Sequence, residues 1–343
     1  MKKLLGIIFI TLILGGCKTQ LVYLTITQPA PVSIPKYVQK VGILNRSLLS
    51  DGNKVLNKVD MVLSEKGPEL DKEGGKESIR GVKDALMQNN RFTDVVLFDN
   101  IELKAGVPGM FPSPLSWDYA EKICKENNVD AIFTLELFET NSNVNISTKP
   151  VTVKTPLGNV PAIETHADMI TTVKTGWRIY DWQSRTILDE YSTSQSLTFS
   201  GSGINPLKAT EALLGRKEAV KQTGYKVGQY YANRILPYRL RVSRDYYVKG
   251  NANFKVATRT ARTGNWDGAA EIWKKETTNN SLKLSSRGCY NMAIINEING
   301  DLEAAIGWAQ KSYETGGKRL ALDYLNILKN RKYNMERLKS QGE

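Results

Sequence analysis

Runs of apolar and polar residues along positions 37–142 predict strands and helices in alternation. An apolar run closed by polar residues, YVQKVGILNRS at 37–47, predicts the first strand. The run TDVVLFDN at 93–100 is short and apolar, which is typical of a buried strand. Between them, residues 77–92 predict an amphipathic helix, because apolar residues recur there at helical spacing: Ile79, Val82, Leu86 and Phe92.

A second helix and a third strand complete this first pattern. Residues 117–128 predict a helix that has Ser116 as its N-cap and Asp118 in its first turn. Residues 129–142, VDAIFTLELFETNS, predict the next strand. The order β-α-β-α-β predicts a parallel or mixed sheet with right-handed crossovers.

Residues 143–200 contain β-rich runs separated by turn-forming residues. PLGN at 156–159 predicts a hairpin tip, and DWQSR at 181–185 predicts the turn between two further strands. We expect these strands to extend the same sheet in antiparallel fashion. Residues 206–238 then show a helical pattern, which Pro237 ends.

The C-terminal part of the chain contains an internal repeat. TGNWDGAAEIWKK at 263–275 is similar to NGDLEAAIGWAQKS at 299–312, at an offset of 36 residues. Glycines in a turn between two helices, and small residues where the helices touch, give this spacing a physical reason. The candidate turn and packing residues are Gly264, Ala269, Ala270, Gly300, Ala304 and Ala305.

This pattern resembles the tetratricopeptide-repeat family over roughly residues 250–333. The resemblance implies a stack of helix pairs with a concave face that docks peptides or proteins. A chance likeness between two ordinary helical hairpins is the alternative. The predicted fold class is α+β: an N-terminal α/β domain at 37–237, with a mixed sheet and an antiparallel extension, followed by all-α tetratricopeptide-like repeats at 238–343.

The first residues have the layout of an export signal. Two lysines precede the apolar run 4–14, which is too short to span a bilayer. The run ends in LGGC at 14–17, which resembles the lipobox of bacterial lipoproteins. That resemblance implies removal of residues 1–16 as a signal peptide and attachment of lipid, palmitate included, to Cys17. An uncleaved anchor or a plain signal peptide is the alternative.

The predicted anchor leads into a segment rich in proline. Residues 17–36 include Pro29, Pro31 and Pro35, and they predict an extended, lipidated tether. Lys18 stands where an acidic residue would mark retention in the inner membrane of enterobacteria. We therefore expect the chain at the outer membrane rather than at the inner one.

The N-terminal pattern also resembles known envelope proteins. Residues 37–140 resemble the α/β domain of periplasmic assembly lipoproteins of the curli-secretion type and the N-terminal domain of the Tol-system translocation protein. The likeness rests on the strand around VVLFDN, the strand beginning VDAIFTLE, and the helices before each. The whole arrangement resembles an uncharacterised lipoprotein family of Bacteroidota-type bacteria, which implies location and architecture but no activity.

Composition and charge add few constraints. The chain is 41% hydrophobic and 24% charged, which is ordinary for a folded protein. The formal charge of +12 would suit an anionic membrane surface or an acidic partner. Because the basic residues are scattered and no nucleic-acid-binding motif accompanies them, we expect no nucleic-acid partner. Cys124 and Cys289 fall in different predicted domains, so we expect buried free thiols, while a disulfide between them stays open.

Candidate chemistry is sparse, and we predict no catalytic residue, cofactor or metal site. Glu136 and Glu139 lie three residues apart on a predicted strand, which places them on opposite faces, so we expect solvated or edge carboxylates. Glu164, His166 and Asp168 share a strand face. Without a second histidine they predict a surface hydrogen-bonded cluster rather than a metal site.

Two further motifs have an ordinary structural interpretation. SGSG at 200–203 lacks the lysine and the helix of a phosphate loop, and it predicts a flexible linker. The aromatic residues Trp177, Tyr180 and Trp182 predict core packing, with a glycan- or partner-binding patch as the alternative.

Together these patterns predict a non-enzymatic cell-envelope lipoprotein that serves as a protein-interaction or assembly module. Its expected partners are the membrane, through lipid on Cys17, and a protein docked on the helical repeats. An oligomeric structural or secretion-associated lipoprotein is the first alternative. An enzyme acting on envelope glycans is the second, and it rests only on Glu136, Glu139 and the aromatic residues.

Overall fold

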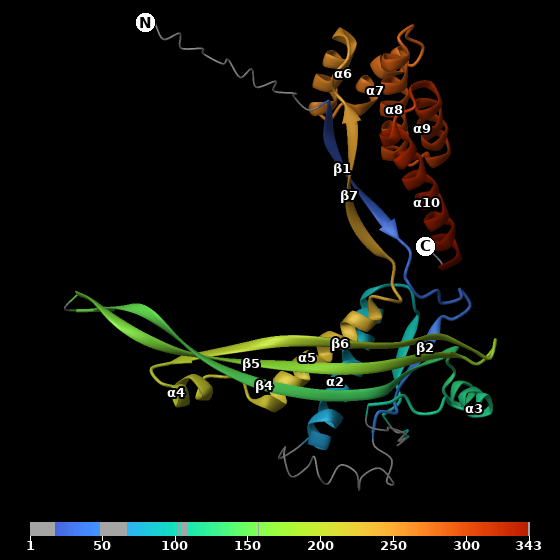
Figure 1. Cartoon of the computed structure of the whole chain (residues 1–343). Coiled ribbons are helices and arrows are strands. Elements are labelled where there is room, and N and C mark those ends of the chain that lie inside the picture. The colour runs from blue at the N-terminus through green and yellow to red at the C-terminus, as the bar shows by residue number, and fades with distance from the viewer. Residues whose placement is uncertain are drawn as a thin grey trace, which may run out of the picture. The chain divides into compact units, whose positions relative to one another are not determined.

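The structure is a computed structural model that describes residues 18–48, 67–99, 101, 103, 109–156 and 158–341. It divides into two compact units (Figure 1). The sheet unit begins at Pro29, runs to Tyr238 and includes the C-terminal residues from Leu338. The helical unit joins the described residues up to Gln28 with Arg239–Arg337.

The sheet unit is built on one mixed five-stranded sheet of order β3-β2-β4-β5-β6. Strand β2 is parallel to β3 and β4, and β5 is antiparallel to β4 and β6. This arrangement confirms the predicted α+β fold with a mixed sheet and an antiparallel extension. The strands are β2 (Lys40–Asn45), β3 (Asp94–Leu97), β4 (Ala131–Thr155), β5 (Gly158–Asp181) and β6 (Thr186–Gly203).

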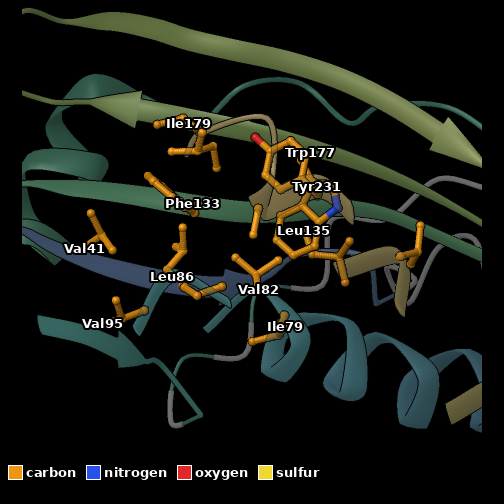
Figure 2. Packing of buried hydrophobic residues seen from close by; sticks show 14 of the residues in the cluster. Val41, Ile79, Val82, Leu86, Val95, Phe133, Leu135, Trp177, Ile179 and Tyr231 are labelled. Atoms are coloured by element: carbon orange, nitrogen blue, oxygen red, sulfur yellow. The ribbon is translucent and has the colours of Figure 1, made fainter. Parts of the chain in front are cut away.

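Helices cover both faces of the inner part of this sheet. On one face, α2 (Gly67–Gln88) and α5 (Arg216–Ala232) enclose the main core, where the rings of Trp177 and Tyr231 stack at 4.8 Å (Figure 2). On the other face, α3 (Trp117–Asn127) closes a smaller apolar cluster. The hydroxyl of Ser116 accepts the N–H of Tyr119, as the capping prediction requires. Where the sequence predicted one helical stretch, the chain forms α4 (Pro206–Glu211) and then α5.

The helical unit combines a two-stranded ribbon with antiparallel helices. Strand β1 (Thr19–Gln28) pairs with β7 (Tyr238–Tyr247). The helices are α6 (Ala252–Arg262), α7 (Trp266–Glu276), α8 (Leu282–Ile298), α9 (Leu302–Gly316) and α10 (Arg319–Gln341). Among the described residues, no helix is both long and apolar enough to cross a membrane.

The ribbon corrects one expectation. The sequence predicts residues 19–28 as part of the extended tether 17–36. Instead these residues form β1, which hydrogen-bonds to residues 238–247 as β7. Because backbone N–H and C=O groups need partners, each segment satisfies the other although they lie far apart in the sequence.

The cysteines agree with the free-thiol interpretation. Cys124 and Cys289 are both buried and unpaired, and each lies in a different unit. Burial raises the pKa of the Cys124 thiol to about 12, and it also raises the pKa of Cys289. Neither thiol is a reactive nucleophile in these surroundings.

Candidate functional site

The most distinctive part of the sheet unit is an arm formed by three long strands (Figure 1). Strand β2 pairs with β4 only as far as Leu135, so the sheet continues beyond it as β4, β5 and β6 alone. We define the arm as Leu137–Thr155, Gly158–Gly176 and Ser192–Gly203. Strand β6 ends opposite Thr165, and the tip beyond that point is the predicted hairpin of β4 and β5.

One face of the arm is polar. Alternate residues of β6 on this face are all hydroxyl residues, and all are exposed: Ser192, Ser194, Ser196, Thr198, Ser200 and Ser202. We call this stripe the serine face. Strand β5 places Thr172 opposite Ser196, and their hydroxyl groups are 2.7 Å apart. An antiparallel sheet with one solvated face is expected to alternate in this way.

The opposite face of the arm is apolar and is partly covered by α4. Ala167 and Met169 of β5 are buried on this face. A Cβ atom added at Gly201 would lie 2.5 Å from the carbonyl oxygen of Ala209, so only glycine lets α4 sit directly on the strand. The prediction that SGSG at 200–203 is a flexible linker is therefore wrong. These residues end β6, and Gly201 and Gly203 let α4 pack directly against the strand.

Past α4 the apolar face is open to solvent. The register places Val144 opposite Met169 and Ile146 opposite Ala167, which puts all four side chains on one face. Ile163, also on this face, is 70% exposed. Ile204 and Leu207, which follow the end of β6, are 85% and 66% exposed. Large exposed apolar side chains gathered on one projecting element are typical of an interaction surface.

The candidate carboxylates of β4 have very different surroundings. Glu136 is completely buried, and it accepts two hydrogen bonds from Nη1 of Arg46, at 2.9 and 2.8 Å. The hydroxyl groups of Thr134 and Tyr180 also donate to it, at 2.7 and 3.0 Å. Nη1 of Arg178 lies 3.9 Å from the same carboxylate.

This network corrects the expectation of a solvated Glu136. The residue lies at a register shift between Leu135 and Leu137, where both faces of β4 are covered. Arg46 and Arg178 also donate to the carbonyl oxygens of Ser113 and Pro112, at 3.1 and 2.6 Å. Glu136 therefore fixes two arginines that hold a loop against the sheet.

Glu139 matches the expectation of a partly solvated carboxylate. Its side chain is 36% exposed, and it lies 3.7 Å from Nζ of Lys174. Near it, Asp71 of α2 accepts a hydrogen bond from the hydroxyl of Thr140 at 2.7 Å. Burial raises the pKa of Asp71 to about 6, and the neighbouring charge of Glu139 adds to that shift.

His166 lies in the hydrogen-bonded cluster that the sequence predicted. Its Nε2 is 2.9 Å from a carboxylate oxygen of Glu164, and Ser200 donates to Asp168 at 2.5 Å. Within the described ranges, no group of three or more histidine, cysteine, aspartate or glutamate residues could hold a metal ion.

The aromatic residues follow the core prediction. Trp177 and Tyr180 are completely buried. The indole of Trp182 is half-buried, with Nζ of Lys125 5.4 Å from its ring centre. The rings of Trp177 and Tyr180 are therefore not available as a glycan platform.

In the helical unit, the two predicted turns have the same geometry. Gly264 and Gly300 take φ angles of +85° and +84°, which favour glycine. Each is followed by an N-cap, Asn265 or Asp301, whose side chain accepts a backbone N–H at 2.9 Å. Behind these turns, Ala269 and Ala305 are completely buried, while Ala270 and Ala304 are half-buried.

The face of α8 toward the ribbon is already occupied. Asn291 of α8 accepts the N–H of Tyr247 at 2.7 Å and donates to its carbonyl at 2.8 Å. Arg244 of β7 binds the buried Glu297 of α8, with two contacts of 2.8 and 2.9 Å. Burial alone would raise the pKa of Glu297, but hydrogen bonds from Arg244, Tyr324 and Arg331 hold it below its usual value.

The structure has two surfaces that the sequence did not predict. One is the outer edge of β6, whose sequence signal is the uncharged stretch YSTSQSLTFSGSG at 191–203. The other is a hollow of about 400 Å³ beside Leu197 of β6. It is lined by residues of α2 and α5 with both signs of charge: Glu77, Arg80, Glu218, Lys221, Gln222, Tyr225 and Lys226.

The predicted lipid attachment site, Cys17, lies outside the described residues.

Comparisons with known proteins give families without an assigned activity. A family model described as Domain of unknown function (DUF8603) matches residues 38–247, and one described as Domain of unknown function (DUF6340) matches residues 255–330. Among curated proteins, no sequence matches this chain.

Among solved structures, the PelC dodecamer from Paraburkholderia phytofirmans is 9% identical, with a TM-score of 0.23 over 61% of this chain and 96% of that one. A putative neuraminyllactose-binding hemagglutinin homolog from Helicobacter pylori is 14% identical, with a TM-score of 0.26 over 60% of this chain and 87% of that one.

Proposed function

The chain belongs to the family described as Domain of unknown function (DUF8603), and we propose that it is a non-enzymatic lipoprotein of the cell envelope that works by binding other proteins. The observation that carries this proposal is the arm. It presents Ile146 and Ile163, 52% and 70% exposed, on the part of the apolar face that α4 leaves open. Water-exposed apolar side chains are stabilised when a partner buries them.

The helical unit supports the same function. Its repeated turns at Gly264 and Gly300 agree with tetratricopeptide-like hairpins, which usually bind proteins. The ribbon strand β7 already contacts α8 through Asn291 and Glu297. We therefore place the repeats' partner site on the outer surface of the helices, where Leu282 is 68% exposed.

The anchor is the second part of the proposal. The lipobox ending in Cys17 supports lipid attachment, and Lys18 after it supports the outer rather than the inner membrane. More than one acyl chain gives stable anchoring, since each buried CH₂ contributes about 0.8 kcal/mol. The protein would then present its arm and helices to other envelope proteins from a membrane surface.

The enzyme alternative has little support in the geometry. Glu136 has no exposed surface, and Arg46, Thr134 and Tyr180 already hydrogen-bond to it. A catalytic carboxylate must reach its substrate within hydrogen-bond distance. The oligomeric alternative is favoured by a separate observation, the free edge of β6.

The proposal is tested by crosslinking in living cells. A photo-crosslinking residue placed at Ile163 or at Leu282 in the full chain should capture a recurrent envelope protein. Capture from position 163 should fall in a Val144→Lys/Ile146→Lys variant, because charge on the apolar face disfavours burial. A matched Asn143→Lys/Asn145→Lys variant on the polar face of β4 should retain it. Capture of the same proteins in all variants, or of none, would contradict the proposal.

A further inference from the structure

Strand β6 is an outer edge of the sheet. In the part of the chain that the structure describes, it pairs with β5 and with no other strand. An edge strand presents a row of backbone N–H and C=O groups that can bind another strand. Proteins normally block such edges with charged residues, proline, bulges or short strands.

The other edges of this sheet carry such blocks. Strand β3 is only four residues long and begins with Asp94. The outer part of β4 is interrupted by Glu139, Lys149, Pro150 and Lys154, so its longest stretch without charge or proline is Thr140–Thr148, nine residues against the thirteen of Tyr191–Gly203. The edge of β6 differs, because Tyr191–Gly203 contains no charged residue and no proline, and its pairing with β5 is regular there. This stretch is therefore open to strand addition along its length.

The residues of this edge are complementary to a second copy of themselves. In an antiparallel pair centred on Leu197, that residue faces its own counterpart, and Gln195 faces Phe199 on the same face. On the serine face, Ser196 would face Thr198, a pairing of hydroxyl groups that stabilises cross-strand contacts. No charged residue meets a like charge within this segment. Such a two-fold arrangement is the commonest symmetry of protein assemblies.

The surroundings of the edge fit the same partner. Leu197 lines the hollow of about 400 Å³ beside α2 and α5, and the other lining residues include both acidic and basic side chains. A two-fold interface brings the same surface of both copies together, so it needs charges of both signs on that surface. Tyr191 of the second copy would lie beside Gly203, and the residues before it, back to the start of β6 at Thr186, would continue past that glycine. The exposed Ile204 and Leu207, which follow that glycine, would then be covered.

From these observations we propose that the outer edge of β6, Tyr191–Gly203, is an interface between two copies of this chain, paired antiparallel about Leu197. The inference rests on the proposed function, since it names one partner of the sheet unit as the chain itself. Backbone hydrogen bonds across the edge supply affinity, and the side-chain pattern fixes the register.

Cysteine crosslinking of the full chain in detergent tests the pairing. Leu197→Cys should give a disulfide-linked dimer under mild oxidation, because paired Cα atoms in an antiparallel ladder lie about 4.5–5.5 Å apart, within disulfide range. Gln195→Cys and Phe199→Cys should each link poorly alone and well when mixed. Val144→Cys, on the edge strand β4 and 41% exposed, is the matched control and should stay monomeric. No linked dimer, or equal linking at Val144, overturns the proposal.

A charge variant provides an independent test. Ser196→Lys/Thr198→Lys would place lysines opposite each other across the two-fold axis, where like charges are destabilising. Analytical ultracentrifugation in detergent should show the dimer dissociation constant rising about tenfold or more. Asn143→Lys/Asn145→Lys on β4 is the control and should dimerise normally. A wild-type monomer overturns this inference. Recurrent capture of another envelope protein at Ile163 would still leave the proposed function standing.

Discussion

At the residue scale, Glu136 shows how burial changes the role of a carboxylate. It is the negative charge between Arg46 and Arg178, and both arginines donate to carbonyl groups of the loop at 112–113. Removing one partner of a buried charge network leaves the other charges uncompensated in a medium of low polarity. We therefore regard Glu136 as a structural residue.

Replacing Glu136 by alanine should lower the free energy of unfolding by about 3–5 kcal/mol, as for other buried pairs that lose one member. Denaturant titration of the full chain measures this loss. Glu139→Ala is the matched control, and it should change stability by less than about 1 kcal/mol, because its contact with Lys174 is partly exposed. A Glu136→Ala variant as stable as the parent would show that the network is not needed for the fold.

At the element scale, the packing of α4 against β6 sets how much of the arm's apolar face is exposed. The helix lies against β6 at Gly201 and Gly203, and a Cβ atom at either glycine would meet the helix backbone at 2.5–2.6 Å. Backbone atoms cannot turn aside as a side chain can. The fit of α4 on the arm therefore depends on these glycines.

Gly201→Ala should displace α4 and lower stability by about 1–3 kcal/mol, the usual cost of overpacking. Hydrogen exchange of the α4 amides should rise in this variant. Ser202→Ala, one position along on the exposed serine face, should leave both quantities unchanged. Unchanged exchange in Gly201→Ala would mean that α4 does not depend on close contact with the strand.

The elements that the sequence predicted are those with a local signal. The strands 37–47 and 93–100 and the helix 117–128 follow from periodicity and capping, and they occur as β2, β3 and α3. The turns at Gly264 and Gly300 follow from a repeat within a short window.

What the sequence could not give depends on partners distant in the chain. Strand β1 pairs with β7 more than two hundred residues away, and Arg46 reaches Glu136 ninety residues away. PLGN predicts the hairpin at the tip of the arm, but which residues share each face of the arm follows only from the register of β4, β5 and β6. Side-chain burial on a strand covered on both sides leaves no alternation in the sequence to detect.

At the scale of the whole molecule, the start of β1 changes how the anchor is understood. The strand begins at Thr19, two residues after Cys17, where the sequence predicted a tether reaching residue 36. Two extended residues span at most about 7 Å. Lipid on Cys17 would therefore hold the ribbon of the helical unit close to the membrane surface, without a long flexible spacer.

This attachment is testable by changing the acceptor thiol. Cys17→Ser should abolish incorporation of labelled palmitate, and the protein should move from the membrane fraction to the soluble one, because the acyl chains supply the binding energy. Cys124→Ser is the matched control, since that thiol is buried in the sheet unit and should not affect lipid attachment. If Cys17→Ser stayed membrane-bound and labelled, the anchor would have to lie elsewhere, and the closeness of the helical unit to the membrane would lose its basis.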